Sequence, residues 1–288
     1  MKSVIITGAN RGIGLDTALL FGRAGYKVFA TMRNPKSAVV LGETAVKDSL
    51  DIKMMQMDVN SDVSVKSCID GIIKENGPVD VLVNNAGIER HGNIEEMDLG
   101  VFKEVMETNY FGVIRCVQAV LPSMRESKNG CIINIASVAG KISNSPLAPY
   151  SASKFALEAL SEALAQEVKP FGLKVKIVEP GIIDTDMAKD IQHADFNENY
   201  PQAQRFGGMF RASLENPTSP TLVAETILEA AQTESWQLRY PVGPDAIPFL
   251  EWRMSMTDEQ WVDWNAQTDE QWYKAVQEDF GLDARVKV

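Results

Sequence analysis

The chain has 288 residues, 45% hydrophobic and 23% charged, an ordinary globular composition that is sufficient for one large core or two small ones. This composition excludes a disordered or fibrous protein, and the apolar stretches are far shorter than the ~20 residues of a bilayer-spanning helix. The formal charge of −11, with no basic run, disfavours nucleic acid and membranes as partners.

Three cysteines and two histidines are scattered along the chain. They are too few and too far apart for a disulfide framework or for the ligand spacing of a zinc site, so we expect neither. Residues 1–3 lead directly into an apolar run, which leaves no length for a secretory signal. We therefore expect a cytoplasmic location.

Short β-branched runs alternate with helix-length amphipathic stretches. The predicted strands are 3–7, 27–31, 52–57, 79–83, 131–136 and 174–179, and the predicted helices are 12–24, 37–48, 62–77, 99–126, 150–170 and 220–233. The alternation is typical of right-handed βαβ units, and continuously apolar runs are typical of strands buried on both faces. We predict an α/β fold with a Rossmann-type doubly wound parallel sheet and helices on both faces, in one domain over residues 1–244.

The first predicted strand ends in a glycine-rich turn. Residues 7–14 read Thr-Gly-Ala-Asn-Arg-Gly-Ile-Gly, at a junction between a strand and a helix. Gly8 permits a sharp turn, Gly12 lets the backbone approach a pyrophosphate, and Gly14 lets the helix pack closely on the sheet. The amino end of the helix offers unpaired N–H groups and a partial positive charge to the anion. The turn therefore predicts dinucleotide binding.

The end of the second predicted strand indicates which dinucleotide is bound. A site for NAD would be expected to place an acidic residue there, but residues 31–34 read Thr-Met-Arg-Asn. Arg33 is suited instead to a 2′-phosphate, and Arg11 in the glycine-rich turn is a second candidate for that phosphate. We expect NADP(H). The alternative is that Arg33 is an ordinary surface residue and that Arg11 pairs with a nearby carboxylate.

Tyr150 and Lys154 are at positions i and i+4 of a predicted helix, so their side chains lie on one face. An ammonium beside a phenol favours the phenolate, and we expect Lys154 to lower the pKa of Tyr150 from ~10. Ser137 follows the fifth predicted strand, where it can donate a hydrogen bond to a substrate oxygen. Taken singly, such residues are more often core, surface and turn residues.

Residues 184–220 lack clear periodicity and directly follow the sixth predicted strand. We interpret this segment as a mobile lid over a ligand. Its apolar side chains predict an apolar substrate pocket, unless they pack against the body of the protein. These residues are Met187, Phe196, Met209 and Phe210.

Residues 245–288 contain four of the five tryptophans, and ten acidic against four basic residues. So many aromatic residues argue against a disordered tail. Thr-Asp-Glu-Gln-Trp occurs at 257–261 and again at 268–272, and Thr followed three residues later by Gln is the pattern of a capping box. We expect a helical extension that packs on the lid or across a dimer interface; the alternative is a surface addition with no part in the chemistry.

The order of these motifs resembles the short-chain dehydrogenase/reductase family over residues 3–240. The family's pattern is matched by the glycine-rich turn, Asp58-Val59, Asn84-Asn85-Ala86-Gly87, Asn109, Ser137, the Tyr-x3-Lys of 150–154, and Pro180-Gly181-Ile182-Ile183-Asp184-Thr185. The resemblance implies a catalytic tetrad of Asn109, Ser137, Tyr150 and Lys154. It also implies that Lys154 holds the nicotinamide ribose and that Asn109 supports a water chain to solvent.

The resemblance further implies a set of cofactor contacts, in which Asp58 and Val59 contact adenine and Thr185 contacts the pyrophosphate or the nicotinamide amide. The full set is Gly8, Asn10, Arg11, Gly12, Ile13, Gly14, Arg33, Asp58, Val59, Asn85, Ala86, Gly87, Tyr150, Lys154, Pro180, Gly181, Ile183 and Thr185.

We therefore expect an NADP(H)-dependent oxidoreductase that interconverts a small-molecule carbonyl and an alcohol by hydride transfer, with Tyr150 as the proton donor or acceptor. Residues 30–33 resemble the hydroxysteroid, retinol and carbonyl reductase branches, which implies reduction of an apolar ketone or aldehyde. The resemblance also implies a homodimer or homotetramer formed through the helices 99–126 and 150–170. The alternatives are an NADP(H)-binding sensor or scaffold without turnover, and an epimerase or dehydratase.

Overall fold

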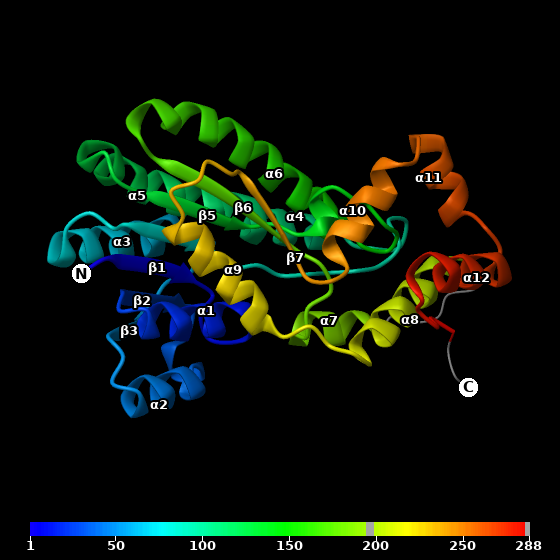
Figure 1. The fold of residues 1–288 in the computed structure, drawn as a ribbon, viewed down its shortest axis with the longest axis horizontal. Coiled ribbons are helices and arrows are strands. Elements are labelled where there is room, and N and C mark those ends of the chain that lie inside the picture. The colour runs from blue at the N-terminus through cyan, green and yellow to red at the C-terminus, as the bar shows by residue number, and fades with distance from the viewer. Residues whose placement is uncertain (194–198, 286–288) are drawn as a thin grey trace.

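The computed structural model describes residues 1–193 and 199–285, which form a seven-stranded parallel sheet between layers of helices (Figure 1). The strand order is β3-β2-β1-β4-β5-β6-β7. The order reverses between β1 and β4, the point where open α/β sheets bind ligands. The predicted doubly wound sheet is confirmed. The strands are β1 (Ser3–Thr7), β2 (Lys27–Met32), β3 (Ile52–Gln56), β4 (Val81–Asn84), β5 (Cys131–Ile135), β6 (Lys174–Pro180) and β7 (Arg239–Val242).

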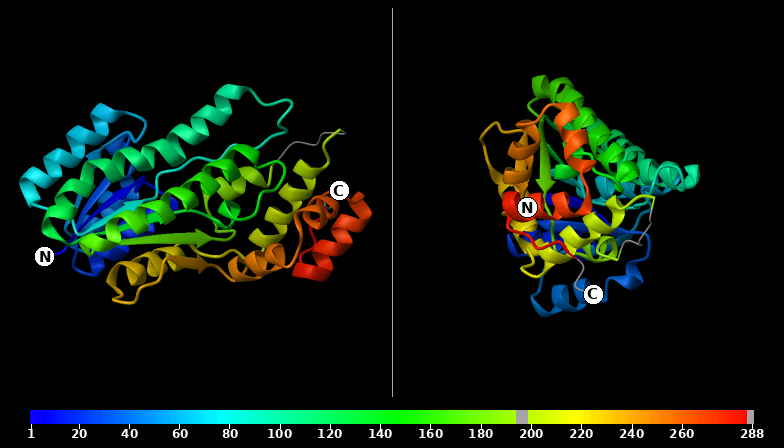
Figure 2. Two further views of the ribbon diagram at one scale, coloured as in Figure 1. Left: turned by 90° about the horizontal axis from the view of Figure 1, so that it is seen from above. Right: turned by 90° about the vertical axis from the view of Figure 1, so that its right-hand side faces the viewer.

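Helices cover both faces of the sheet (Figures 1 and 2). Successive strand residues point to opposite faces. Val4 and Ile6 of β1 therefore belong to one core, and Ile5 belongs to the other. The first core lies under α1 (Gly12–Arg23), α2 (Val39–Lys47) and α9 (Pro220–Gln232). The second core lies under α3 (Asp62–Asn76), α5 (Gly112–Ser127) and α6 (Ala148–Val168).

The two edge strands differ from the prediction. β7 was not predicted, because its four residues include Pro241 and form no apolar run. Proline has no backbone N–H to donate, and it is tolerated because β7 lies at the edge of the sheet. β3 lies at the opposite edge and is partly exposed, so the expectation of burial on both faces is wrong for this strand.

The single helix predicted over 99–126 is interrupted. α4 (Leu99–Met106) and α5 are joined by a π turn, Glu107–Phe111, which contains the buried Asn109. Such turns bulge out of a helix and are frequent at functional sites. The i+3/i+4 pattern of apolar residues does not distinguish a π turn from a regular helix.

The segment predicted as a lid without periodicity contains two helices, α7 (Asp186–Ile191) and α8 (Gln202–Leu214). Ala203, Phe206, Phe210 and Leu214 recur along α8 at intervals of three and four residues, a helical spacing that the prediction overlooked. Phe206, Met209 and Phe210 of α8 belong to a third core that includes residues of the C-terminal extension. Phe196 lies outside the described residues.

The C-terminal extension consists of α10 (Ala246–Met254), α11 (Asp258–Asn265) and α12 (Asp269–Phe280). Both predicted capping boxes are confirmed, whereas α10 was not predicted. In the first box, the backbone N–H of Gln260 donates to Thr257 Oγ1 at 3.2 Å, and the backbone N–H of Thr257 donates to Gln260 Oε1 at 2.8 Å. None of the helices in the described ranges is long and apolar enough to span a bilayer.

The helices α11 and α12 lie beside α8, at the end of the molecule far from the N-terminus (Figures 1 and 2). The tryptophans of the extension pack against one another and against α8. The Trp252 ring meets those of Trp261 and Trp264 edge to face, at centroid distances of 5.2 and 4.8 Å. The rings of Trp264 and Trp272 also meet edge to face, with their centroids 5.6 Å apart. Trp261 Nε1 donates a hydrogen bond to the Ser143 carbonyl at 3.1 Å. The extension is therefore ordered and packed on the α8 region of its own chain.

We expect Trp272→Ala to lower the free energy of unfolding by about 3–5 kcal/mol, because it leaves a cavity in the third core. Trp272 is 4% exposed. The control is Trp236→Ala, since Trp236 lies outside that core and is 48% exposed. Equilibrium unfolding in urea measures both. Equal losses in the two variants would show that the extension adds little to stability.

Candidate active site

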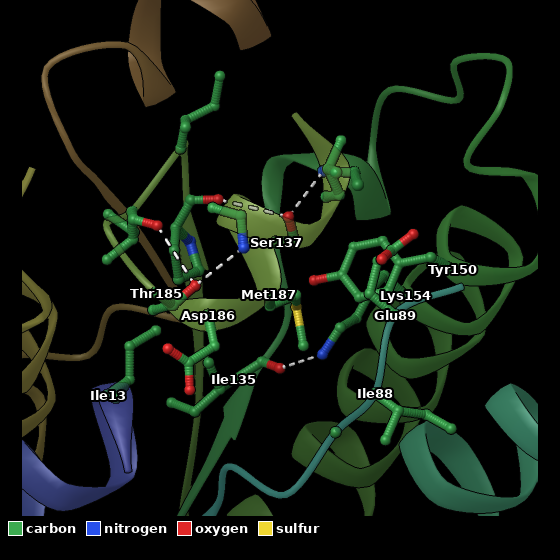
Figure 3. Close-up of a pocket in the computed structure, with 18 of the residues that line it drawn as sticks. Ile13, Ile88, Glu89, Ile135, Ser137, Tyr150, Lys154, Thr185, Asp186 and Met187 are labelled. Atoms are coloured by element: carbon green, nitrogen blue, oxygen red, sulfur yellow. Dashed lines mark hydrogen bonds between the residues drawn. The ribbon is translucent and has the colours of Figure 1, made fainter. Parts of the chain in front are cut away.

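A large cavity of about 810 Å³ opens at the carboxyl ends of the strands. Its wall is formed by the loops after β1 to β6 on one side, and by α8 and the C-terminal extension on the other. Of the predicted site residues, Asn109 is the exception that does not line the cavity. Figure 3 shows the inner part, where Ser137, Tyr150 and Lys154 lie close together.

The glycine-rich turn is locked by the loop after β4. Gly8 has a φ of +67°, and an added Cβ would lie 2.9 Å from the Ala86 Cα atom. At Gly14 an added Cβ would lie 2.4 Å from the Gly8 carbonyl oxygen, so this close helix contact requires glycine. Asn85 Nδ2 donates to the carbonyls of Thr7 and Gly8 at 2.9 and 3.2 Å. These bonds fix the turn that was predicted to bind a pyrophosphate.

The two arginines that were predicted to bind a phosphate differ in their side-chain partners. Arg33 directly follows β2, lines the cavity and is exposed, and its side chain makes no hydrogen bond or ion pair with any residue that the structure describes. Arg11 Nη1 lies 3.0 Å from Asp186 Oδ2, and these side chains are 71% and 63% exposed. The alternative that Arg11 pairs with a carboxylate thus holds in this structure. Such exposed pairs contribute about 0–1 kcal/mol, so a phosphate could displace Asp186 at low cost.

Ser137 and Lys154 are held by backbone groups at the ends of β5 and β6 (Figure 3). Ser137 Oγ accepts from the Ala139 N–H at 3.1 Å and donates to the Pro180 carbonyl at 3.4 Å. Lys154 Nζ donates to the Ile135 carbonyl at 2.8 Å. The ammonium lies 5.5 Å from the centroid of the Tyr150 ring.

The prediction that Lys154 lowers the pKa of Tyr150 is wrong for this structure. Burial is the main cause that raises the pKa of Tyr150 to about 12; a side-chain hydrogen bond with Ser137 opposes the rise, and the negative charge of Glu89 adds to it. Burial also lowers the pKa of Lys154 to about 8. Near neutral pH the phenol therefore keeps its proton, as a proton donor must.

Asn109 acts on the backbone rather than on the cavity. Its Oδ1 accepts from the Ile88 N–H at 2.8 Å, and its Nδ2 donates to the Ile88 carbonyl and to Ser153 Oγ, both at 2.9 Å. The side chain thus connects the loop after β4 to α6, one residue before Lys154. Thr185 is likewise occupied, since its Oγ1 accepts from the Ala188 N–H at 3.3 Å and caps α7.

Two buried carboxylates near the site, Glu158 and Glu89, were not among the predicted site residues. Glu158 lies one turn after Lys154 on α6 and accepts from Arg239 Nη2 of β7 at 2.7 Å. Burial raises the pKa of Glu158 to about 7, and its charge in turn raises the pKa of Lys154. The i, i+4, i+8 spacing of 150, 154 and 158 was the available signal. Glu89 lines the cavity beside Tyr150, and no motif marked it.

Comparisons with known proteins agree with this geometry. The model of the short chain dehydrogenase family matches residues 2–195. The 3-ketodihydrosphingosine reductase of Bacteroides thetaiotaomicron is 36% identical over 251 residues, which are 84% of this chain and 87% of that protein. A crystal structure of a short-chain dehydrogenase from Streptomyces avermitilis has a TM-score of 0.79 and 32% identity, and covers 92% of this chain and 96% of its own.

Similar structures differ in the nicotinamide cofactor that they contain. A metagenomic short-chain oxidoreductase in complex with NADP has a TM-score of 0.68 and 25% identity, with coverage of 84% of this chain and 96% of its own. A short chain dehydrogenase/reductase from Burkholderia phymatum in complex with NAD has a TM-score of 0.78 and covers 88% and 93%. At 23% identity the second likeness concerns the fold alone.

Proposed function

Because this chain belongs to the short-chain dehydrogenase/reductase family, whose members are oxidoreductases that use a nicotinamide cofactor, we propose that it is NADP(H)-dependent and reduces an apolar ketone or aldehyde. The observation that carries the cofactor choice is the guanidinium of Arg33 at the end of β2, which has no hydrogen-bond or ion-pair partner among the described residues; an enzyme for NAD would place an acidic residue there.

The residues around the glycine-rich turn fit a dinucleotide. Gly12 has a φ of +52° and lines the cavity, so an added Cβ would be strained and would occupy part of the space that a pyrophosphate needs. Arg33 and Arg11 would hold the 2′-phosphate, and Asp58 and Val59 the adenine. When bound, NADPH supplies the hydride.

The remaining roles belong to side chains at the inner end of the cavity. Ser137 polarises the substrate carbonyl by donating a hydrogen bond to its oxygen. Tyr150 donates its proton to the alkoxide as the alcohol forms, which its raised pKa favours at neutral pH. The Lys154 ammonium holds the cofactor ribose and stabilises the phenolate that remains. Asn109 holds the loop after β4 in place.

An apolar substrate is supported by the outer wall of the cavity. Its side chains are largely aromatic and come from α8 and the C-terminal extension: Phe206, Met209, Phe210, Phe249, Trp252, Trp261, Trp264, Trp272 and Phe280. The name of the Bacteroides relative describes reduction of a keto compound, which supports a ketone as the reacting group. Mixing the protein with NADPH and a panel of apolar ketones tests this proposal through the loss of NADPH absorbance.

We expect kcat/KM for carbonyl reduction to fall as the pH rises through about 8, the pKa of Lys154 in the free enzyme. Below this pH the lysine carries its positive charge, and above it the charge is lost. Lys154→Arg keeps a cation at higher pH, so its residual activity should not fall near pH 8. A wild-type profile that stays flat well above pH 8 would exclude this role of the Lys154 charge.

A homodimer or homotetramer formed through α4, α5 and α6 is part of the proposal. Large apolar side chains are exposed on or beside these helices. Because exposed apolar patches commonly mark protein–protein interfaces, these side chains support association of two chains. They include Leu99, Phe111 and Phe155, which are 65%, 45% and 42% exposed. A second copy of the chain would cover them.

A further inference from the structure

We infer that Glu89 selects carbonyl substrates that carry a hydrogen-bond donor, an ammonium or a hydroxyl group, next to the reacting carbonyl. The inference rests on the proposed carbonyl reduction and names its substrate class more closely. The substrate would have a polar end at Glu89 and an apolar body along the tryptophans of the extension.

The position of Glu89 is unusual for a carboxylate. It follows the Asn-Asn-Ala-Gly motif by two residues, lines the cavity and is 7% exposed. Figure 3 shows it beside Tyr150, and its charge acts on that phenol. A buried carboxylate is costly unless donors surround it. A group of this kind at the wall of a substrate cavity therefore favours a ligand that supplies a donor.

The carboxylate is also held in place. Both backbone groups of Ile88, the preceding residue, are bonded to the Asn109 side chain. His91 Nδ1 lies 3.1 and 3.3 Å from the two Glu89 carboxylate oxygens. Glu89 therefore points in a defined direction before any substrate binds, which improves recognition because little side-chain entropy is lost on binding.

Glu89 retains capacity to accept hydrogen bonds. An ionised carboxylate has about four lone-pair sites. Within residues 1–193 and 199–285, the side-chain bonds of Glu89 run to a single nitrogen of His91. The nearest cationic residue in sequence, Arg90, directs its Nη2 to Glu104 at 3.2 Å instead. The free sites of Glu89 are thus available to a donor on the substrate.

An ammonium group should be preferred to a hydroxyl group. A hydrogen bond between two charged groups is stronger than one in which a single partner is charged, particularly where water is excluded. The formal charge of −11 on the chain also attracts cations rather than anions. The aromatic side chains that line the same cavity hold the apolar part of the molecule.

The test uses three ketones that share one long alkyl chain and differ only next to the carbonyl, where they carry an ammonium group, a hydroxyl group or hydrogen. The proteins are the wild type, Glu89→Gln, and the control Glu104→Gln, which removes an exposed carboxylate of the same cavity. The measured quantity is the ratio of kcat/KM for each substituted ketone to kcat/KM for the plain ketone. Because Tyr150 protonates the product of all three ketones, any effect of Glu89 on the pKa of Tyr150 cancels in this ratio.

We expect Glu89→Gln to lower the ratio for the ammonium ketone about ten- to a hundredfold, and the ratio for the hydroxyl ketone by less. Glu104→Gln should leave both ratios unchanged. Equal ratios in the wild type and Glu89→Gln would overturn the inference, because a purely structural or Tyr150-directed role slows all three ketones alike.

A binding measurement separates this inference from the proposed function. Binding of the corresponding amino alcohol with NADP present is followed by tryptophan fluorescence, because Trp261, Trp264 and Trp272 line the cavity. If no ketone is reduced by the wild type, the proposed function fails. Weaker binding of the amino alcohol to Glu89→Gln than to the wild type would still support the Glu89 site, and equal binding would refute it.

Discussion

Tyr150→Phe should lower kcat for carbonyl reduction by about a hundred- to ten-thousandfold, while the Kd for NADPH stays nearly unchanged. The substitution keeps the buried ring and removes the proton that the alkoxide needs. Lys154 Nζ is held by the Ile135 carbonyl rather than by the phenol hydroxyl, so the cofactor side of the site should keep its geometry. Single-turnover rates and NADPH titrations measure the two effects separately.

The matched control is Tyr26→Phe, because Tyr26 is a buried tyrosine of the core between α1 and β2, away from the cavity. This variant should retain full activity. Residual activity of Tyr150→Phe within tenfold of the wild type would contradict the catalytic assignment. A sensor or scaffold that binds NADP(H) would show no turnover even in the wild type, so the experiment also separates that alternative from an enzyme.

Arg33→Asp should invert the cofactor preference from NADPH to NADH. Charge-assisted hydrogen bonds contribute about 1.5–3 kcal/mol, so loss of the Arg33 guanidinium should weaken NADPH binding by roughly one to two orders of magnitude. The new carboxylate repels the 2′-phosphate and accepts hydrogen bonds from the ribose hydroxyls of NADH. Titrations of both cofactors against both proteins give the preference directly.

Arg23→Asp is the control for the change in net charge. Arg23 pairs with Asp48 at 2.8 Å on the surface and does not line the cavity, so the variant alters the same amount of charge at a distance from the ligand. Its cofactor preference should stay that of the wild type. If the wild type already binds NADPH and NADH equally, the assignment of Arg33 to the 2′-phosphate is wrong.

The parts of the fold that were predictable depend on local patterns. The apolar runs of β1, β2 and β4 to β6 are strong signals because both faces of these strands are buried. The capping boxes at Thr257 and Thr268 are equally local, since each is formed by a threonine and the glutamine three residues later.

The parts that were missed depend on tertiary contacts. β7 exists as a strand because β6 offers it an edge, although Pro241 argues against a strand locally. α8 packs Phe206, Met209 and Phe210 against the C-terminal extension, a contact that no local pattern reveals. The number of tryptophans in the extension indicated that they are buried, but no local pattern identifies the surface against which they pack.

In the candidate site, too, local motifs were predictable and the effects of burial were not. The predicted site residues were identified from their order along the chain, and the structure brings all of them except Asn109 to one cavity. The pKa of Tyr150 was predicted in the wrong direction, because the spacing of Tyr150 and Lys154 reveals proximity but not burial. Glu89 was overlooked because its importance comes from burial beside Tyr150, which no local pattern shows. Glu158 was overlooked although it continues the spacing of Tyr150 and Lys154, because that spacing does not show that the carboxylate is buried.

The most direct test of the proposed activity is transfer of deuterium from NADPH labelled at the nicotinamide C4 position to the alcohol formed from an apolar ketone. We predict that the alcohol gains one deuterium at the former carbonyl carbon when one of the two C4 positions is labelled and none when the other is labelled, since the enzyme holds one face of the ring toward the substrate. An alcohol without deuterium from either labelled cofactor, or no alcohol across the ketone panel, would contradict the assignment of this chain as a carbonyl reductase.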